Sequence, residues 1–452
     1  MSLWTRGQVA EVLAAPEPPA AHAEYTGVST DTRQLREGEL FVALRGERFD
    51  AHAFLADAKA RGARAAVVRR GTPPVDGLPF FEVPDTLAAL GLLARVRRRA
   101  CPPGSPVVAV TGSSGKTTTR EMIRAALATR WRVHATAGNL NNLVGVPLTI
   151  LGAPPPGEVD ALVVEAGASV PGEIPRLRDI IEPTIAVIIN VGPAHLEGFS
   201  SLEGVLREKL SLADGAPLAV VGTDPPVLAA EARRRTRTIV AGTAEWADVR
   251  PESATLDDDG RPVIRWQGHA VTLPSQVVGF HQIENAMIAL AVARETGAEP
   301  ARALAALAEV RIPPGRGAVR QVRGLTVIDD SYNANPSSLG WAVRLALWLA
   351  SRRGRPLAVV VGSMLELGPE SARLHAAAAG EIAALAPALV GAVGEFVPAF
   401  EAHRRTLGDR LVTAPDAAAL GPRLRAALQG DEVVLLKASR GVALERVLDF
   451  LT

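Results

Sequence analysis

The sequence has only one cysteine, Cys101, among its 452 residues. A single cysteine excludes internal disulfides and cysteine-based metal clusters. It fits a reducing compartment, although a cysteine-poor exported protein would show the same count. We therefore expect a cytoplasmic protein.

Excess charge and long hydrophobic runs are also missing. The formal net charge is +1, which gives no electrostatic case for a nucleic-acid or membrane-surface partner. No apolar run reaches the roughly 18 residues of a transmembrane helix, so we expect no membrane insertion. The first residues, MSLWTRGQVAEVLAAPEPP, carry Arg6 and Glu11 among apolar residues. They predict an amphipathic helix ended by prolines, and not a signal peptide.

The length suggests about three domains. Short-period repeats and low-complexity tracts are absent. A plausible linker, RRRACPPGSP at 97–106, begins with a basic run that is most simply a solvated helix end. A second seam lies at 310–319, in VRIPPGRGAV. The predicted domains are therefore 1–102, 103–312 and 313–452, each mixed α/β.

Short, nearly all-apolar segments alternate with helical ones from Val107 onward. VVAVTG, ALVVEAG, TIAVIINVG and PLAVVG are typical of a parallel sheet covered on both faces. RPVIRWQGHAVTL at 261–273 predicts a β-hairpin, and HQIENAMIALAVARETG predicts a helix. After the second seam LTVIDD, LAVVVG, ALVGAVG and EVVLLKAS alternate with helices again. The prediction is a chain of α/β layers.

The segment TGSSGKTT, which follows the strand VVAV and precedes a helical pattern, is suited to hold phosphate. Gly112 and Gly115 let the backbone N–H groups converge on one anion, and the following helix adds its positive end. Lys116 supplies a charge for the β- and γ-phosphates and Thr117 a hydroxyl for Mg²⁺. The loop is shorter than the standard pattern, because Val110 stands where that pattern has its first glycine. Nucleotide binding alone leaves a regulatory switch and a ligase both open.

The loop resembles that of the Mur ligases, the ATP-dependent amide-forming enzymes of peptidoglycan precursor synthesis. The resemblance continues in the N-terminal VSTDTRQLREGELFVALRGERFDAHAF at 28–54 and in NLNNLVGVPLTIL at 139–151. Two further segments that carry the resemblance are SYNANPSS at 331–338 and GSMLELG at 362–368. It implies a UDP-binding N-terminal domain, a central P-loop domain with a parallel sheet, and a C-terminal Rossmann-like domain.

The last two segments resemble the family members that take a dipeptide acceptor. They imply that UDP-N-acetylmuramoyl-tripeptide and D-alanyl-D-alanine are joined through an acyl phosphate, with ADP and phosphate released. ATP and two Mg²⁺ ions would be required, and the protein would be a monomer. A ligase of the same family with another amino acceptor is the nearest alternative. A P-loop regulatory NTPase with partner-binding flanks is the alternative of a different class.

The resemblance also implies a metal site. Glu165, at the end of a strand, and His195 would bind the second Mg²⁺, while Thr117 serves the first. Lys209 would be carbamylated to N6-carboxylysine and act as a further ligand. The family usually has an acidic residue where this chain has Ser211. Taken alone, these residues would be a solvated strand-end acid, an exposed or structural histidine and a helix-surface lysine.

Further residues match binding positions of the family. For ATP they are Gly112, Ser113, Ser114, Gly115, Lys116, Thr117, Thr118, Asn285, Arg316 and Asp330. For the UDP-sugar they are Thr32, Arg33, Asn139, Asn141 and Asn142, and for the dipeptide or nucleotide Tyr332, Asn333 and Asn335. Lys116 and Arg316 count as catalytic together with Glu165, His195 and Lys209. Plain loop and turn chemistry would also produce the asparagine-rich segments. The chain departs from the family pattern at Leu143, Gln282, Ser363 and Ala438.

Overall fold

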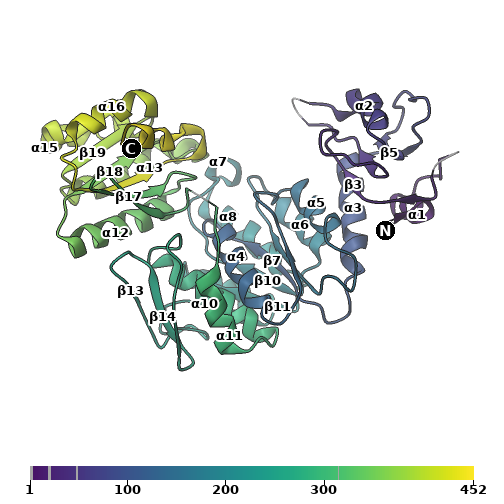
Figure 1. The fold of residues 1–452 in the computed structure, drawn as a ribbon, viewed down its shortest axis with the longest axis horizontal. Coiled ribbons are helices and arrows are strands. Elements are labelled where there is room, and N and C mark those ends of the chain that lie inside the picture. The colour runs from purple at the N-terminus through teal and green to yellow at the C-terminus, as the bar shows by residue number, and fades with distance from the viewer. Residues whose placement is uncertain (1–3, 19–21, 47–48, 314, 452) are drawn as a thin grey trace. The chain divides into compact units, whose positions relative to one another are not determined.

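The computed structural model describes residues 4–18, 22–46, 49–313 and 315–451, in which helices alternate with strands (Figure 1). Backbone contacts divide the chain into two compact units. Unit 1 comprises Met1–Val110, Trp131–Ala168 and Gly172–Ala186. Unit 2 comprises Thr111–Arg130, Ser169–Pro171 and Val187–Thr452. The three domain boundaries drawn from the sequence stay a prediction.

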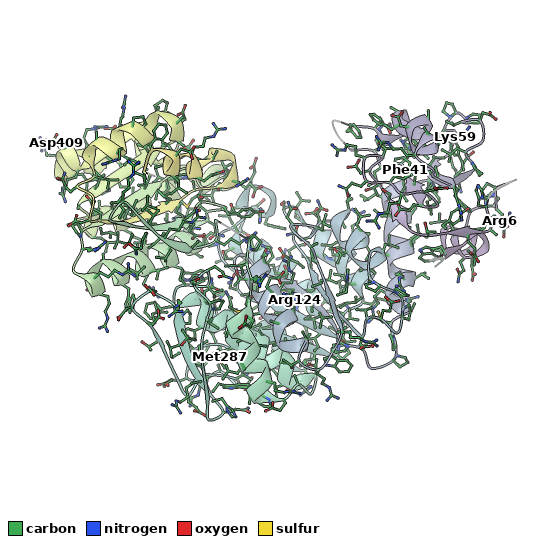
Figure 2. All side chains as sticks on the ribbon, in the orientation of Figure 1. Arg6, Phe41, Lys59, Arg124, Met287 and Asp409 are labelled. Carbon is green, nitrogen blue, oxygen red and sulfur yellow. The ribbon has the colours of Figure 1, made fainter. Side chains whose placement is uncertain are left out.

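The N-terminal part of unit 1 contains a four-stranded parallel sheet with the order β3-β4-β5-β6. Its strands are β3 (Val28–Ser29), β4 (Leu40–Val42), β5 (Ala65–Arg69) and β6 (Phe80–Val83), with α2 (Leu55–Ala60) packed against them. Phe41 (Figure 2), Leu55 and Val68 lie in its core and are at most 3% exposed. The predicted N-terminal helix is confirmed as α1 (Arg6–Leu13), which follows β1 (Trp4–Thr5); β1 pairs with β2 (Glu24–Tyr25).

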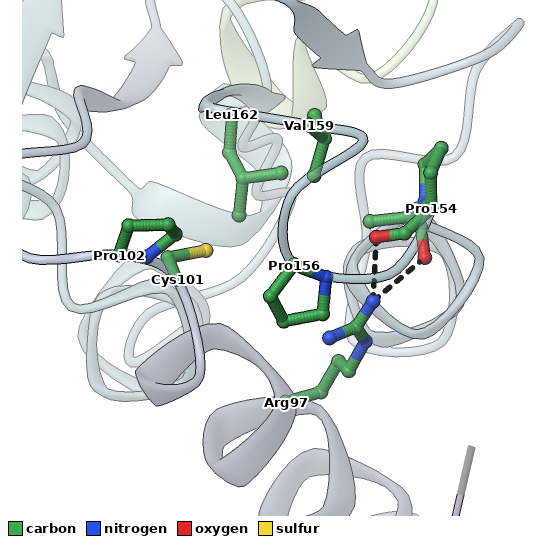
Figure 3. A pocket seen from close by; sticks show the side chains of 8 residues that line it. Arg97, Cys101, Pro102, Pro154, Pro156, Val159 and Leu162 are labelled. Atoms are coloured by element: carbon green, nitrogen blue, oxygen red, sulfur yellow. Dashed lines mark hydrogen bonds between the residues drawn. The ribbon is translucent and has the colours of Figure 1, made fainter. Parts of the chain in front are cut away.

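Helix α3 (Thr86–Arg99) ends in the basic run of the predicted linker. The prediction that this run is solvated is wrong for Arg97, which is only 9% exposed. Its Nη2 donates to the carbonyl oxygens of Ala153 at 3.0 Å and Pro154 at 2.6 Å, drawn as dashed lines in Figure 3. Arg97 and Cys101 line the small pocket of that figure, where burial raises the pKa of the thiol. Arg97 thus fastens the end of α3 to the segment at 153–154.

Replacing Arg97 with alanine is expected to lower the free energy of unfolding by about 1–3 kcal/mol, because two carbonyl groups lose a charged donor. Urea unfolding followed by circular dichroism measures the change. Arg70→Ala is the matched control, since Arg70 is exposed and no side-chain hydrogen bond of it is found among the described residues. Equal unfolding midpoints for the two variants would contradict the expectation.

The central sheet has six strands in the order β12-β11-β10-β7-β9-β8. They are β7 (Val107–Thr111), β8 (Val133–Ala135), β9 (Ala161–Glu165), β10 (Ile185–Ile188), β11 (Leu218–Val221) and β12 (Thr238–Val240). β7 and β8 each run parallel to β9, and β11 runs parallel to β12. Four of these strands are the apolar segments predicted from Val107 onward, and all four are buried along their length. Their composition reflects a sheet covered on both faces.

Helices flank the central sheet. They are α4 (Lys116–Leu127), α5 (Gly145–Leu151), α6 (Glu173–Ile181), α7 (Leu196–Phe199), α8 (Leu202–Leu210), α9 (Pro226–Arg233), α10 (His281–Glu295) and α11 (Pro300–Ala306). α10, which the sequence predicted, packs along α4 and is buried on nearly all sides. The predicted hairpin is confirmed by the antiparallel strands β14 (Pro262–Trp266) and β15 (His269–Thr272), with β13 (Ser253–Leu256) beside β14. No helix within the described ranges is both long enough and apolar enough to cross a membrane.

The C-terminal sheet has the order β16-β17-β21-β18-β19-β20. Its strands are β16 (Ala318–Val322), β17 (Leu325–Asp330), β18 (Leu357–Val361), β19 (Leu389–Val393), β20 (Leu411–Ala414) and β21 (Val433–Lys437). Its helices include α12 (Pro336–Arg353), α13 (Ser371–Ala384), α14 (Phe396–Ala399), α15 (Arg404–Leu407), α16 (Ala417–Ala427) and α17 (Leu448–Leu451). Only β16 is antiparallel to its neighbour. Because β17, β21 and β18 are parallel neighbours, the loops after them meet at one edge of the sheet.

Candidate active site

The phosphate loop connects β7 to α4, the strand–turn–helix order that the sequence predicts. Gly115 caps α4 with a φ of +81°, a conformation that favours glycine. Asn190 holds the loop from the side. The backbone N–H of Ser114 donates to its Oδ1 at 3.0 Å, and its Nδ2 donates to the carbonyl of Ser114 at 3.2 Å. The Ser113 hydroxyl donates to the carbonyl of Gly192 at 3.0 Å. These bonds fix the loop in shape before any anion binds.

Lys116, Thr117 and Thr118 form the first turn of α4. Backbone N–H groups in a first turn lack partners within the helix, and they create positive potential. Nζ of Lys116 donates to the carbonyl of Gly112 at 2.8 Å, so the ammonium lies over the loop. Thr117 and Thr118 are 3% and 4% exposed. The arrangement is that of an anion-binding site with an added cation.

Asn285, on α10, lies against the phosphate loop. Its Oδ1 is 3.1 Å from the position that a Cβ on Gly115 would occupy. Its Nδ2 donates to Oε1 of Gln282 at 2.8 Å, and both residues are buried. Gln282, one of the departures from the family pattern, therefore orients this amide. The contact of Asn285 with adenine stays a prediction.

Lys209, near the end of α8, is 1% exposed, so the alternative of a helix-surface lysine is wrong. Burial lowers its pKa to about 7, and the charge of Lys116 contributes to the lowering. Half of such amines are neutral near pH 7, and only a neutral amine reacts with carbon dioxide. Ser211, the departure from the family pattern, donates its hydroxyl to the carbonyl of Glu208 at 2.6 Å. Lysine is rare in this sequence: the chain has only four, at positions 59, 116, 209 and 437.

His195 precedes α7 with a φ of +55°. Its Nδ1 lies 2.6 Å from Oε2 of Glu366, in the loop after β18. The distance is that of a charge-assisted contact, although the ring N–H is not aligned well enough for a standard hydrogen bond. The side chain is 21% exposed, so the histidine is neither freely solvated nor fully enclosed.

In unit 1, Glu165 ends β9 and is 1% exposed, so the interpretation as a solvated strand-end acid is wrong. Its backbone N–H donates to Oγ1 of Thr136 at 2.9 Å. Its Oε1 accepts from Nδ2 of Asn141 at 2.9 Å. The structure thus brings the asparagine-rich loop directly onto the predicted metal-binding carboxylate.

The other residues predicted for the UDP-sugar are less enclosed. Oδ1 of Asn142 accepts from the backbone N–H of Gly145 at 2.8 Å at the start of α5, and Asn139 is exposed. Arg33 forms a bidentate pair with Asp31, with bonds of 2.9 and 2.7 Å, and keeps 83% of its side chain exposed. Thr32 lies in the turn between them. Among the described residues, no hydrogen bond joins Thr32 or Arg33 to the asparagine loop.

The loop after β17 carries the residues predicted for the dipeptide end. The guanidinium of Arg316 lies over the ring of Tyr332, 4.1 Å from its centroid. Asp330 pairs with Lys437 at the end of β21, at 2.7 Å. Nζ of Lys437 also donates to the carbonyl of Asn333 at 2.6 Å. The buried ammonium of Lys437 therefore fixes the shape of this loop.

Asn335 connects the same loop to the phosphate loop. Its side chain caps α12 by accepting from the backbone N–H of Ser338 at 2.9 Å. Its Nδ2 donates to Oγ of Ser114 at 3.0 Å. The SYNANPSS segment and the phosphate loop, more than 200 positions apart in the sequence, are thus in direct contact.

Sequence reasoning missed three residues that shape this site, Asn190, Lys437 and Glu366. Asn190 and Lys437 are polar residues that follow or end apolar strands, the signal that identified Glu165, so the same reasoning could have found them. Glu366 lies in a turn without periodicity and gives no such signal. Ser363 accepts from the backbone N–H of Glu395 at 2.9 Å and Ala438 is fully buried, so these two departures serve local packing.

Three of the four predicted metal ligands suit Mg²⁺ in their chemistry, since hydroxyl, carboxylate and carbamate oxygens are hard donors, whereas the imidazole of His195 is a softer nitrogen donor. Within the described part of the chain, no three His, Cys, Asp or Glu side chains gather as a metal-binding group. Glu165 and His195 are only two such residues. The predicted site would therefore also need the hydroxyl of Thr117 and a modified Lys209.

Three descriptions of one family match the chain. Residues 24–98 match "Mur ligase family, catalytic domain", residues 110–293 "Mur ligase middle domain", and residues 315–440 "Mur ligase, glutamate ligase domain". The chain belongs to the Mur ligase family, and the predicted three-domain α/β fold is confirmed. The alternative of a regulatory NTPase has no support in these matches.

Within this family the chain is similar to MurF. It is 35% identical to UDP-N-acetylmuramoyl-tripeptide--D-alanyl-D-alanine ligase of Escherichia coli, over 98% of this chain and 97% of the relative. The enzyme of that name from Bacillus subtilis is 34% identical, with coverages of 93% and 92%. A crystal structure of MurF from Acinetobacter baumannii matches with a TM-score of 0.87 at 30% identity, over 99% of this chain and 98% of that one. MurF ligase from Thermotoga maritima in complex with ADP matches with a TM-score of 0.82 at 30% identity, over 94% and 96%.

Proposed function

We propose that this protein is an ATP-dependent ligase that joins D-alanyl-D-alanine to UDP-N-acetylmuramoyl-tripeptide in peptidoglycan precursor synthesis. Two relatives named for this reaction align with 98% and 93% of the chain, which supports the assignment. The geometric observation that carries it is the hydrogen bond from Asn335 to Ser114. A reaction that transfers an acyl group from an acyl phosphate to an amine, with loss of phosphate, needs the amine near the phosphate site. The contact between Asn335 and Ser114 would bring the proposed dipeptide-binding loop to the phosphate loop.

The nucleotide would occupy the phosphate loop. Residues 112–118 would hold the phosphates, Asn285 the adenine, and Arg316 and Asp330 would complete the site. Thr117, Glu165, His195 and a carbamylated Lys209 would hold two Mg²⁺ ions, which when bound reduce the repulsion between the triphosphate and an incoming carboxylate. The ADP complex of the relative from Thermotoga maritima supports the nucleotide part of this proposal.

The reaction has two steps. The terminal carboxylate of the tripeptide attacks the γ-phosphorus of ATP, and ADP leaves as an acyl phosphate forms. The amine of the dipeptide then attacks the acyl carbon, phosphate leaves, and the amide is complete. In the first step Lys116 would stabilise the negative charge on the phosphates, and Arg316 would contribute a second positive charge. Rate enhancement comes mainly from positioning and from preorganised charge.

The UDP-sugar substrate and the dipeptide would bind to different parts of the chain. Thr32, Arg33, Asn139, Asn141 and Asn142 would bind the UDP-sugar, since amide side chains both donate and accept hydrogen bonds. Tyr332, Asn333 and Asn335 would bind the dipeptide. The domains would be 1–102, 103–312 and 313–452, in a monomer that works in the cytoplasm, where ATP is available.

A phosphate-release assay tests the function. The complete mixture contains the protein, ATP, Mg²⁺, UDP-N-acetylmuramoyl-tripeptide and D-alanyl-D-alanine, and each component is omitted in turn. We expect sustained release only in the complete mixture, with the amide product identified by mass spectrometry. A strong preference for a single amino acid over the dipeptide would assign the chain to the alternative ligase, and release without any acceptor would reject a ligase altogether.

Carbamylation of Lys209 is expected to depend on pH. With a pKa of about 7 in place of 10.5, the amine is largely neutral at about pH 8 and largely protonated at about pH 6. Protonation blocks attack on carbon dioxide, so carbamate occupancy falls as the pH falls through 7. ¹³C NMR of protein kept in ¹³C-bicarbonate measures the occupancy, and a signal that persists in Lys209→Ala would assign it to another amine.

A further inference from the structure

The loop after β18 makes three contacts with the start of α7. Nδ1 of His195 lies 2.6 Å from Oε2 of Glu366. The backbone N–H of Glu197 donates to the carbonyl of Glu366 at 3.1 Å. A Cβ on Gly368 would stand only 3.0 Å from Cα of Glu197, so the two backbones are closer than a residue with a side chain would ordinarily allow. The carboxylate thus reaches the imidazole from a firmly seated loop.

Glu366 is the polar group that faces Nδ1. The nitrogen is shielded from solvent, and no other described residue offers it a hydrogen-bond partner. The 2.6 Å between Nδ1 and Oε2 is within the range of a hydrogen bond to a carboxylate. A proton held on Nδ1 leaves Nε2 as the nitrogen with a free lone pair. A carboxylate behind a metal-binding imidazole fixes the tautomer and orients the ring in this way.

Both residues of the pair adopt left-handed backbone conformations. The φ of His195 is +55° and that of Glu366 is +65°. Such residues are uncommon outside glycine, and their strain persists where surrounding contacts enforce it. Two strained residues whose polar side chains meet indicate a contact with a function beyond packing.

We propose that Glu366 is a positioning residue for His195: its carboxylate fixes the imidazole so that Nε2 is presented to the second divalent cation. The proposal rests on the proposed function, because it concerns the cation site of that reaction. Glu366 lies in the loop after β18 of the C-terminal sheet, and His195 lies beside the central sheet. The cation site would therefore be complete only when these two segments are in contact, which links seating of the loop after β18 to readiness of the cation site.

The experiment measures cation binding and turnover separately. Mn²⁺ binding to the full chain with a nonhydrolysable ATP analogue is followed by electron paramagnetic resonance for the wild type, Glu366→Gln and Glu366→Ala. We expect one of two Mn²⁺ sites to weaken about tenfold or more in Glu366→Ala. Glu366→Gln, which keeps an acceptor oxygen, should fall between Glu366→Ala and the wild type. In the ligation assay kcat should fall while the KM for D-alanyl-D-alanine stays within about twofold.

Glu370→Gln is the matched control, because its carboxylate lies four positions away and pairs with Arg373 at 2.5 Å. The double variant His195→Ala/Glu366→Gln should bind Mn²⁺ no more weakly than His195→Ala alone, since the glutamate acts through the ring. Unchanged Mn²⁺ affinity in Glu366→Ala would overturn the proposal, and so would additive losses in the double variant. A wild type that binds two Mn²⁺ ions but ligates no dipeptide would reject the proposed function instead.

Discussion

Replacing Lys209 with alanine is expected to reduce kcat for ligation by about 10²–10³-fold, the usual loss when one preorganised charged group is removed from a reaction site. In the proposed site the buried amine would take up carbon dioxide and provide a carboxylate-like ligand. Short-chain carboxylates such as acetate should restore part of the activity, because the cavity left by the lysine stem can admit them. Phosphate release at saturating substrates, with and without acetate, measures both effects.

Lys59→Ala is the control for the Lys209 variant, since Lys59 is an exposed lysine on helix α2 (Figure 2). It should retain wild-type activity and show no response to acetate. Full activity of Lys209→Ala in buffer free of carboxylates would show that neither the amine nor its carbamate takes part. Activity lost together with the circular dichroism signal would instead indicate unfolding, and the acetate response separates these outcomes.

Replacing Lys116 with alanine is expected to lower kcat by about 10³-fold, because the γ-phosphate loses the cation that lies over the loop. Lys116→Arg should restore little, since the planar guanidinium is wider than the ammonium that fits against the carbonyl of Gly112. Phosphate release measures kcat for both variants, and the Kd of a fluorescent ATP analogue measures nucleotide binding.

Arg124→Ala is the matched control for Lys116. It removes a cation from the same helix, α4, where Arg124 is 41% exposed and pairs with Glu121 at 2.7 Å (Figure 2). We expect turnover within about twofold of the wild type, since an exposed pair contributes little. If Lys116→Ala kept wild-type turnover, the role of the phosphate loop in the reaction would be wrong.

Most strands could be predicted from the sequence because buried parallel strands have to be apolar throughout. VVAVT and LAVVV are such segments, and each has every residue buried. β16, with the sequence AVRQV, was not predicted, because it is an antiparallel edge strand whose residues are half-buried or exposed. Whether a strand lies at the edge of a sheet, and whether it runs parallel or antiparallel, depends on the strand it pairs with. The amino-acid composition of the strand does not contain that information.

The site was only partly predictable. The phosphate loop was found because its chemistry is local, with glycines, lysine and threonine in one turn. The burial of Lys209 could not be read from its helix, since REKL has the charge pattern of a solvated face. The burial of Arg97 could not be predicted either, because its hydrogen-bond partners are carbonyl groups more than 50 positions away in the sequence. Glu366 meets His195 only through packing of distant segments, a relation that no local pattern contains.

Because lysine is scarce in this enzyme, its lysine amines can be followed individually by NMR. Reductive methylation with ¹³C-formaldehyde marks amines and leaves arginine untouched, so a 47.3 kDa chain with four lysines would yield a spectrum of a few resolved methyl signals. Single substitutions would assign each of them without isotopic labelling of the backbone. A carbamylated amine is no longer a nucleophile, so the signal of position 209 should emerge only after carbon dioxide is stripped from the buffer.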